Sequence, residues 1–195
     1  MASKKRRAAE EDGPVQATTA DECIMVIRES VFFYAPVETL YTLKLLKALG
    51  AASEFALRTC TWPSDARVYL YINSGGGCAF AGLSAMDHIR TNHVPVITIA
   101  DGFVASAATF MLLGGYERKS MTNAKILIQQ LSTAFWGKYV DLDEARNSED
   151  LIESLGKVYA EYTNLRGKKL TSLLRKELHM NAIHSLECGF VDEIW

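Results

Sequence analysis

Short runs of β-branched and aromatic residues alternate with glycine turns and helix-compatible segments in the middle of the chain, and this alternation limits the fold most. Val68–Ile72 predicts a strand, Asn73–Gly77 a glycine turn and Ala79–Thr91 a helix. Val94–Ala100 and Lys125–Gln129 predict two further strands. Because parallel strands need a crossover segment between them, this order predicts an α/β fold with a parallel sheet built from βαβ units.

The segments around these strands extend the pattern. Cys23–Val37 predicts strand, and Val37–Glu54 carries leucines at helical spacing. Asp101–Ala105 predicts a turn, and Ser106–Leu113 predicts a short helix that ends at two glycines. Together these segments provide both the strands and the helices of an α/β unit.

The last third of the chain predicts one long amphipathic helix. Asp141 and Glu144 form a D-x-x-E capping pattern, and apolar residues then recur at three- and four-residue steps as far as Leu165. A helix of this length suits a subunit contact, but the pattern predicts packing within the subunit equally well. Asn181 predicts the cap of a last short helix, and Phe190–Trp195 predicts a terminal strand.

Length and composition limit the organisation and the partners. Of the 195 residues, 1–22 are mostly charged or small and predict a flexible arm, and 23–195 predict a single domain. The net charge of -2 favours neither a nucleic acid nor a membrane as partner, and we interpret the basic cluster Lys4–Arg7 as part of a solvated arm. The longest uncharged stretch, Gly102–Tyr116, is shorter than the roughly 20 residues of a membrane span.

The cysteines and histidines indicate that the protein resides in a reducing compartment and has no metal-binding site. Four dispersed cysteines form no CxxC pair, and no signal peptide is recognisable, which predicts free thiols and a cytoplasmic protein. No Cys/His cluster has metal-ligand spacing. We therefore expect neither a metal nor a cofactor.

Two turns that follow predicted strands are candidates for chemistry. Asn73–Gly77 and Asp101–Ser106 lie at the carboxyl edge of the predicted sheet, where ligands bind in open parallel sheets. A run of glycines lets backbone N–H groups approach an anion, such as the oxyanion of acyl transfer, although a purely structural turn is the alternative. A dinucleotide site is not favoured, because Phe80 stands where the third glycine of GxGxxG would be.

Ser106 is a candidate nucleophile at the start of the predicted short helix. The N–H groups of Gly77 and Ala107 would then donate to the oxyanion. A serine at a helix start is more often an N-cap, so the residue type alone favours a cap. A nucleophile also needs a base, and the pattern places none of the four histidines beside Ser106: His88, His93, His179 and His184.

Four segments, taken together, resemble the caseinolytic protease (ClpP) family. YLYINSGGG is similar to the family's YLYINSPGG, GFVASAATFMLLGG to G-x-A-A-S-M-G-A-x-L-L, NAKILIQQ to N-S-x-x-M-I-H-Q, and ECGFVDEIW to E-Y-G-L-I-D. The agreement runs in order over about residues 24 to 195, which is far more specific than any single motif.

The resemblance implies a ClpP/crotonase-like α/β fold with a long handle helix within about 130–167. It also implies homo- or hetero-oligomeric rings, two stacked heptamers around a proteolytic chamber, and an AAA+ unfoldase that delivers unfolded polypeptides. Ser106 matches the nucleophile, and Gly77 and Ala107 match the oxyanion-hole donors. Tyr69 and Tyr71 match aromatic positions of the surface that docks the unfoldase.

Two triad positions depart from the family. Gln129 occupies the place of the general-base histidine, and Glu177 the place of the orienting aspartate. Because a neutral amide cannot accept the serine proton, our first interpretation is a chamber subunit with weak or lost peptidase activity, similar to the non-catalytic ClpR subunits. Gly75 also replaces the family's proline in the glycine turn.

Two alternatives remain open. One is an active ClpP-type serine endopeptidase, cellular or of the viral head-maturation type, in which His179, Glu177 or a neighbouring subunit supplies the base. The other is a different crotonase-fold activity, such as acyl-CoA chemistry, that uses the oxyanion hole without the serine. A CoA-sized pocket would favour the second alternative.

Overall fold

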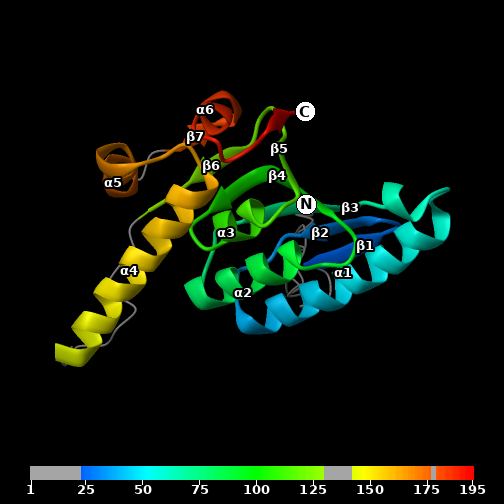
Figure 1. The fold of residues 1–195 in the computed structure, drawn as a ribbon, viewed down its shortest axis with the longest axis horizontal. Coiled ribbons are helices and arrows are strands. Elements are labelled where there is room, and N and C mark those ends of the chain that lie inside the picture. The colour runs from blue at the N-terminus through cyan, green and yellow to red at the C-terminus, as the bar shows by residue number, and fades with distance from the viewer. Residues whose placement is uncertain (1–22, 130–141, 177–178) are drawn as a thin grey trace, which may run out of the picture.

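The computed structural model describes residues 23–129, 142–176 and 179–195, and the strands in these ranges form one eight-stranded sheet (Figure 1). The main path runs β1-β2-β3-β4-β5-β8, and β6 pairs with both β4 and β7. All pairs are parallel except β1 with β2 and β6 with β7, which confirms the predicted α/β fold. The strands are β1 (Ile24–Ile27), β2 (Ser30–Phe33), β3 (Val68–Ser74), β4 (Val96–Ala105), β5 (Glu117–Ser120), β6 (Lys125–Leu127), β7 (Met180–Asn181) and β8 (Glu193–Ile194).

Three helices cover one face of the sheet and form the core with it. Figure 1 shows α1 (Thr39–Thr59), α2 (Ala79–Arg90) and α3 (Ala108–Leu113) on the same side. Residues of β3 alternate between buried and half-buried, and its fully buried side chains face these helices. Each fully buried aliphatic side chain stabilises the fold by about 1.5–3 kcal/mol, so this alternation fixes which face of the sheet receives the helices.

The segment predicted as strand over Cys23–Val37 is a hairpin. Strands β1 and β2 pair in antiparallel fashion, and Arg28 at the turn has φ +58°. The adjacent charged residues Arg28 and Glu29 allow the chain to reverse at the surface. Strand β2 then runs parallel to β3, with α1 as the crossover between them.

Strand β4 is longer than the sequence predicts. It spans Val96–Ala105, so the turn predicted at Asp101–Ala105 is wrong. The pairing of β3 with β4 shifts register here, which marks a bulge. Gly102 in the bulge has φ +85°, and a Cβ on it would lie 2.8 Å from the side-chain nitrogen of Asn73. The first half of β4 pairs with β5 and the second half with β6, so the bulge directs the end of β4 toward β6.

The predicted long helix is confirmed as α4 (Leu142–Tyr162). Figure 1 shows α4 reaching away from the sheet, with its C-terminal end beside the rest of the fold. Leu155 and Tyr159 of this end belong to the buried core, whereas Ile152 is 43% exposed. The C-terminal part of α4 therefore packs within the subunit.

The remaining elements are short. Helix α5 is Gly167–Lys176 and helix α6 is Ala182–Glu187. The predicted cap is confirmed, because the Asn181 side chain accepts a hydrogen bond of 2.8 Å from the amide of His184. The terminal strand β8 covers only two residues of the segment predicted at Phe190–Trp195.

Several predictions fall outside the described residues. These are the N-terminal arm 1–22, the first part of the handle region at 130–141, and Glu177. Among the described residues, no helix is both long enough and apolar enough to cross a lipid bilayer.

Candidate active site

Three strand ends meet at one edge of the sheet. β3 leads into the glycine turn Gly75–Gly77, β4 ends directly before Ser106, and β6 ends two residues before Gln129. Ala105 of β4 lies opposite Leu127 of β6 in parallel register. Because the carboxyl ends of neighbouring parallel strands lie side by side, the sheet brings Ser106 and Gln129 to one place.

The backbone of Ser106 is in the left-handed region, with φ +52°. This conformation costs a non-glycine residue on the order of 1–3 kcal/mol. The amide of Ser106 donates to the carbonyl oxygen of Leu127 at 2.9 Å, and its own carbonyl accepts from the amide of Thr109 at 2.9 Å. The N-cap of α3 is Ala107, and no side chain caps the helix, so Ser106 is not the N-cap that its residue type favours. It lies instead on a sharp strand-to-helix turn, as a nucleophile elbow requires.

Gly76 allows the glycine turn to approach Ser106. Its φ is +92°, and a Cβ on it would lie 2.6 Å from the carbonyl oxygen of Ala105 and 2.7 Å from the Cβ of Ser106. Any side chain would therefore displace one of the two turns. A Cβ on the neighbouring Gly75 would have no atom within 4 Å, so the close approach of the two turns does not require a glycine at position 75.

Gly77 is held by the segment that precedes α1. It forms an isolated bridge with Val37, whose amide donates to the carbonyl of Gly76 at 2.9 Å and whose carbonyl accepts from Cys78 at 2.7 Å. Within the part of the chain that the structure describes, the amides of Gly77 and Ala107 have no hydrogen-bond acceptor. Two backbone donors are thus left available at the edge where Ser106 lies.

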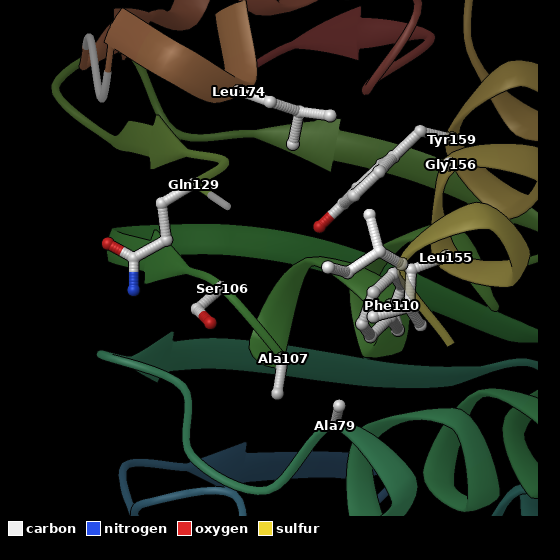
Figure 2. A pocket seen from close by; sticks show the side chains of 10 residues that line it. Ala79, Ser106, Ala107, Phe110, Gln129, Leu155, Gly156, Tyr159 and Leu174 are labelled. Atoms are coloured by element: carbon white, nitrogen blue, oxygen red, sulfur yellow. The ribbon is translucent and has the colours of Figure 1, made fainter. Parts of the chain in front are cut away.

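A small apolar pocket with a volume of about 50 Å³ opens beside Ser106. Ser106 and Gln129 lie at one end of it, and the side chains of Phe110, Leu155 and Tyr159 lie at the other (Figure 2). The remaining lining residues are Ala79, Ala107, Ile152, Gly156 and Leu174. The pocket therefore lies between the strand ends and the helices α3, α4 and α5, and most of the side chains that line it are apolar.

Gln129 is the polar side chain that shares this pocket with Ser106. It is exposed and carries a neutral carboxamide, which donates and accepts hydrogen bonds but takes up no proton near neutral pH. At this position the site has no group with the basicity of an imidazole.

The histidines lie elsewhere. His88 is exposed on α2, and His93 is exposed before the amino end of β4, away from the carboxyl edge. His179 is exposed and stacks on Phe103 with 5.3 Å between ring centroids. His184 lies on α6. None of the four is among the described residues that line the pocket.

Tyr69 and Tyr71 lie on the half-buried side of β3, opposite the face that α1 covers. The ring of Tyr71 stacks on Phe32 with 4.7 Å between centroids, and Tyr69 lies 6.4 Å from Trp195. Burial, and then the nearby charge of Asp101, raise the pKa of Tyr71. These tyrosines thus belong to an aromatic surface away from the pocket of Ser106.

The sequence does not identify two polar residues that adjoin the site. Tyr159 is part of the apolar stripe of α4, but its hydroxyl lies 2.7 Å from the hydroxyl of Thr109 on α3. Burial raises the pKa of Tyr159, so this hydroxyl stays protonated. The stripe indicates that Tyr159 is buried, and nothing in it indicates the polar partner.

No cluster of three or more metal-ligating side chains occurs among the residues that the structure describes. The four cysteines have free thiols.

Known proteins resemble this chain in sequence. Two curated relatives are the ATP-dependent Clp protease proteolytic subunit of Deinococcus radiodurans, 31% identical over 133 residues, and the ATP-dependent Clp protease proteolytic subunit 2 of Treponema denticola, 34% identical over 130 residues. The aligned regions cover 67% and 65% of this chain. The chain spans 65% of the length of each relative.

The fold and a family model agree with these relatives. The solved structure of a ClpP1 variant from Listeria monocytogenes superimposes with a TM-score of 0.72 at 21% identity, over 86% of this chain and 91% of that one. This likeness confirms the predicted ClpP-like fold. The model described as Clp protease matches residues 31–195, which is most of the chain. By this match, the chain belongs to the Clp protease family.

Proposed function

We propose that this chain is a ClpP-like subunit of an ATP-dependent proteolytic chamber, with weak or lost peptidase activity. The observation that carries the proposal is that Gln129, a neutral amide, shares the pocket of Ser106 in a chain of the Clp protease family. Membership in the Clp protease family favours a role in proteolysis over one in acyl-CoA chemistry. The missing base makes the subunit structural or regulatory.

The chemistry explains why Gln129 matters. When the oxygen of Ser106 forms a bond to a peptide carbonyl carbon, the hydroxyl proton must pass to a base. Gln129 cannot take that proton. The amides of Gly77 and Ala107 are still available for the oxyanion, and such an incomplete site retains on the order of 10³–10⁴-fold rate enhancement over water, far below an intact triad.

The partners follow from the same proposal. We infer rings of ClpP-like subunits, of one or more sequences, that receive unfolded polypeptides from an AAA+ unfoldase. The names of the relatives support this inference, since both are proteolytic subunits of an ATP-dependent Clp protease. The aromatic surface of Tyr69, Tyr71 and Phe32 supports an unfoldase contact, and the free cysteines support a reducing compartment such as the cytoplasm.

One observation favours an alternative, an active ClpP-type serine endopeptidase with a substitute base. Ser106 keeps the strained backbone of an elbow nucleophile, and both amide donors are unoccupied among the described residues. In this alternative the base comes from a neighbouring subunit, from Glu177, or from His179 after it leaves Phe103.

The test is labelling of the purified protein with a fluorophosphonate that reacts with activated serines. We expect no labelling above that of the Ser106→Ala variant, and we expect Gln129→His to increase the labelling rate by about 10²-fold or more, the usual contribution of a general base. Gln129→Asn is the matched control, because it keeps a neutral amide.

A second measurement mixes the protein with an active ClpP and follows particle mass. Co-assembly without labelling of Ser106 supports the chamber subunit. Labelling of the unmodified protein that disappears in Ser106→Ala would establish the active endopeptidase instead.

A further inference from the structure

Tyr159 is a buried tyrosine whose hydroxyl is engaged next to the candidate site. Its side chain is almost fully buried, and the ring packs against Phe110 and Phe190 with centroid distances of 5.2 and 6.0 Å. The hydroxyl reaches across from α4 to Thr109 on α3, at 2.7 Å. The aromatic neighbours hold the ring, so the direction of this hydroxyl is well defined.

Thr109 also forms hydrogen bonds to Ser106. Its hydroxyl donates to the carbonyl oxygen of Ser106 at 2.6 Å, and its amide donates to the same oxygen at 2.9 Å. A threonine hydroxyl has a single proton. Because that proton goes to Ser106, the hydroxyl of Tyr159 must donate to Thr109. The order of donors is therefore Tyr159 to Thr109 to the carbonyl of Ser106.

The carbonyl that receives these bonds belongs to the same peptide group as the amide of Ala107. A peptide group is planar, and none of the described peptide bonds is cis, so the C=O of Ser106 and the N–H of Ala107 point in opposite directions within one plane. Holding the carbonyl thus fixes the direction of the N–H. That N–H has no acceptor among the described residues and lies where the proposed function places an oxyanion donor.

We propose that Tyr159 and Thr109 are positioning residues that orient the Ser106–Ala107 peptide, so that helix α4 determines where the Ala107 N–H and the Ser106 side chain point. The inference rests on the proposed role of Ser106 and Ala107 at the reacting site. The left-handed backbone of Ser106 makes such support necessary, because a strained peptide relaxes unless its hydrogen bonds hold it.

The test uses variants that remove one hydroxyl and keep the shape. Tyr159→Phe keeps the ring that lines the pocket, and Thr109→Val keeps the volume of threonine. Both are made in the Gln129→His protein, where a base is present, and the rate of fluorophosphonate labelling of Ser106 is measured. We expect each variant to slow labelling about tenfold. The double variant should be no slower than Thr109→Val alone, because Tyr159 acts through Thr109.

Two controls separate positioning from general destabilisation. Thr109→Ser retains the hydroxyl and should keep the labelling rate within about threefold of the parent. Tyr162→Phe removes a hydroxyl from the same helix as Tyr159, outside the hydrogen-bond chain from Tyr159 through Thr109 to Ser106, and should leave the labelling rate unchanged. Equal labelling rates in Tyr159→Phe, Thr109→Val and Tyr162→Phe would overturn the proposal.

A second readout needs no chemistry at Ser106. The amide of Thr109 donates to the carbonyl of Ser106, so its hydrogen exchange reports whether the peptide is held. If the Gln129→His protein is not labelled, the proposed role of Gln129 as the missing base position fails. The exchange rate of the Thr109 amide then tests the positioning role of Tyr159 and Thr109 by itself. Exchange about tenfold faster in Tyr159→Phe and Thr109→Val than in Tyr162→Phe supports it, and unchanged exchange overturns it.

Discussion

At the scale of single residues, the candidate site depends on a close approach between two backbone turns. Gly76 and Gly75 are adjacent, but only a Cβ on Gly76 meets other atoms, at 2.6 Å from the carbonyl oxygen of Ala105. We expect Gly76→Ala to lower the free energy of unfolding by at least about 2 kcal/mol, from the positive φ and the overlap, and, when made in the Gln129→His protein, to abolish the labelling of Ser106.

Gly75→Ala is the matched control for this change. It should alter the free energy of unfolding by less than about 0.5 kcal/mol. Urea denaturation measures both variants. Equal stabilities of the two alanine variants would mean that the turns can separate without cost, and that the site is looser than the distances indicate.

The sequence predicts the positions of the site but not its connections. Gly77, Ser106 and Gln129 follow strands whose apolar runs are recognisable, so their meeting at one edge is predictable from topology. The contact of Tyr159 with Thr109 joins residues 50 positions apart. No local pattern reports such a pair, because it depends on how α4 packs against α3.

At the scale of elements, the predictions succeed where a strand is buried and fail where it is polar. β3 has the alternation of a half-buried strand, and the structure confirms it. The sequence does not predict β5, because its residues ERKS have no apolar periodicity. In the structure Lys119 of β5 pairs with Glu193 of β8 at 2.7 Å, so the charges are satisfied across the edge of the sheet. The missed half of β4 contains Asp101 and Gly102, which are typical turn residues but form a bulge here.

Helix α4 offers a test of the pocket at this scale. Gly156 lies in the helix and lines the pocket, and a Cβ on it would meet no atom within 4 Å. Gly156→Ala should raise the free energy of unfolding by about 0.5–1 kcal/mol through helix propensity. In the Gln129→His protein, Gly156→Leu should fill the pocket and reduce labelling of Ser106 by probes that carry a large apolar group, while small probes react as before.

The control for helix propensity is Gly50→Ala in α1. A Cβ on Gly50 would also meet no atom within 4 Å, and Gly50 does not line the pocket. Gly50→Ala should give a similar gain in stability and, in the Gln129→His protein, should leave the labelling of Ser106 unchanged. If Gly156→Leu leaves the preference between large and small probes unchanged, this pocket does not receive the apolar group.

At the scale of the whole molecule, one arginine joins the end of α4 to the sheet. Arg118 on β5 donates to the carbonyl oxygens of Tyr162 at 2.7 Å and Gly189 at 2.9 Å. Its guanidinium also forms an ion pair with Asp192, and its backbone amide donates to the same carboxylate at 2.9 Å. Because only 18% of the Arg118 side chain is exposed, these bonds are partly protected from water. They connect the sheet, the last turn of α4 and the loop after α6.

Arg118→Ala should therefore loosen α4 more than the sheet. We expect the free energy of unfolding to fall by about 2–3 kcal/mol, since two carbonyls and a half-exposed carboxylate lose their donor. Arg118→Lys should recover less than half of this, because an ammonium group does not reproduce the planar fork. In Arg118→Ala, hydrogen exchange should accelerate more in α4 than in β3. The control Arg175→Ala, on the exposed face of α5, should change the exchange rates of neither element. Uniform acceleration in α4 and β3 would mean that α4 opens only with the whole fold, and Leu155 and Tyr159 would then leave the pocket only when the protein unfolds.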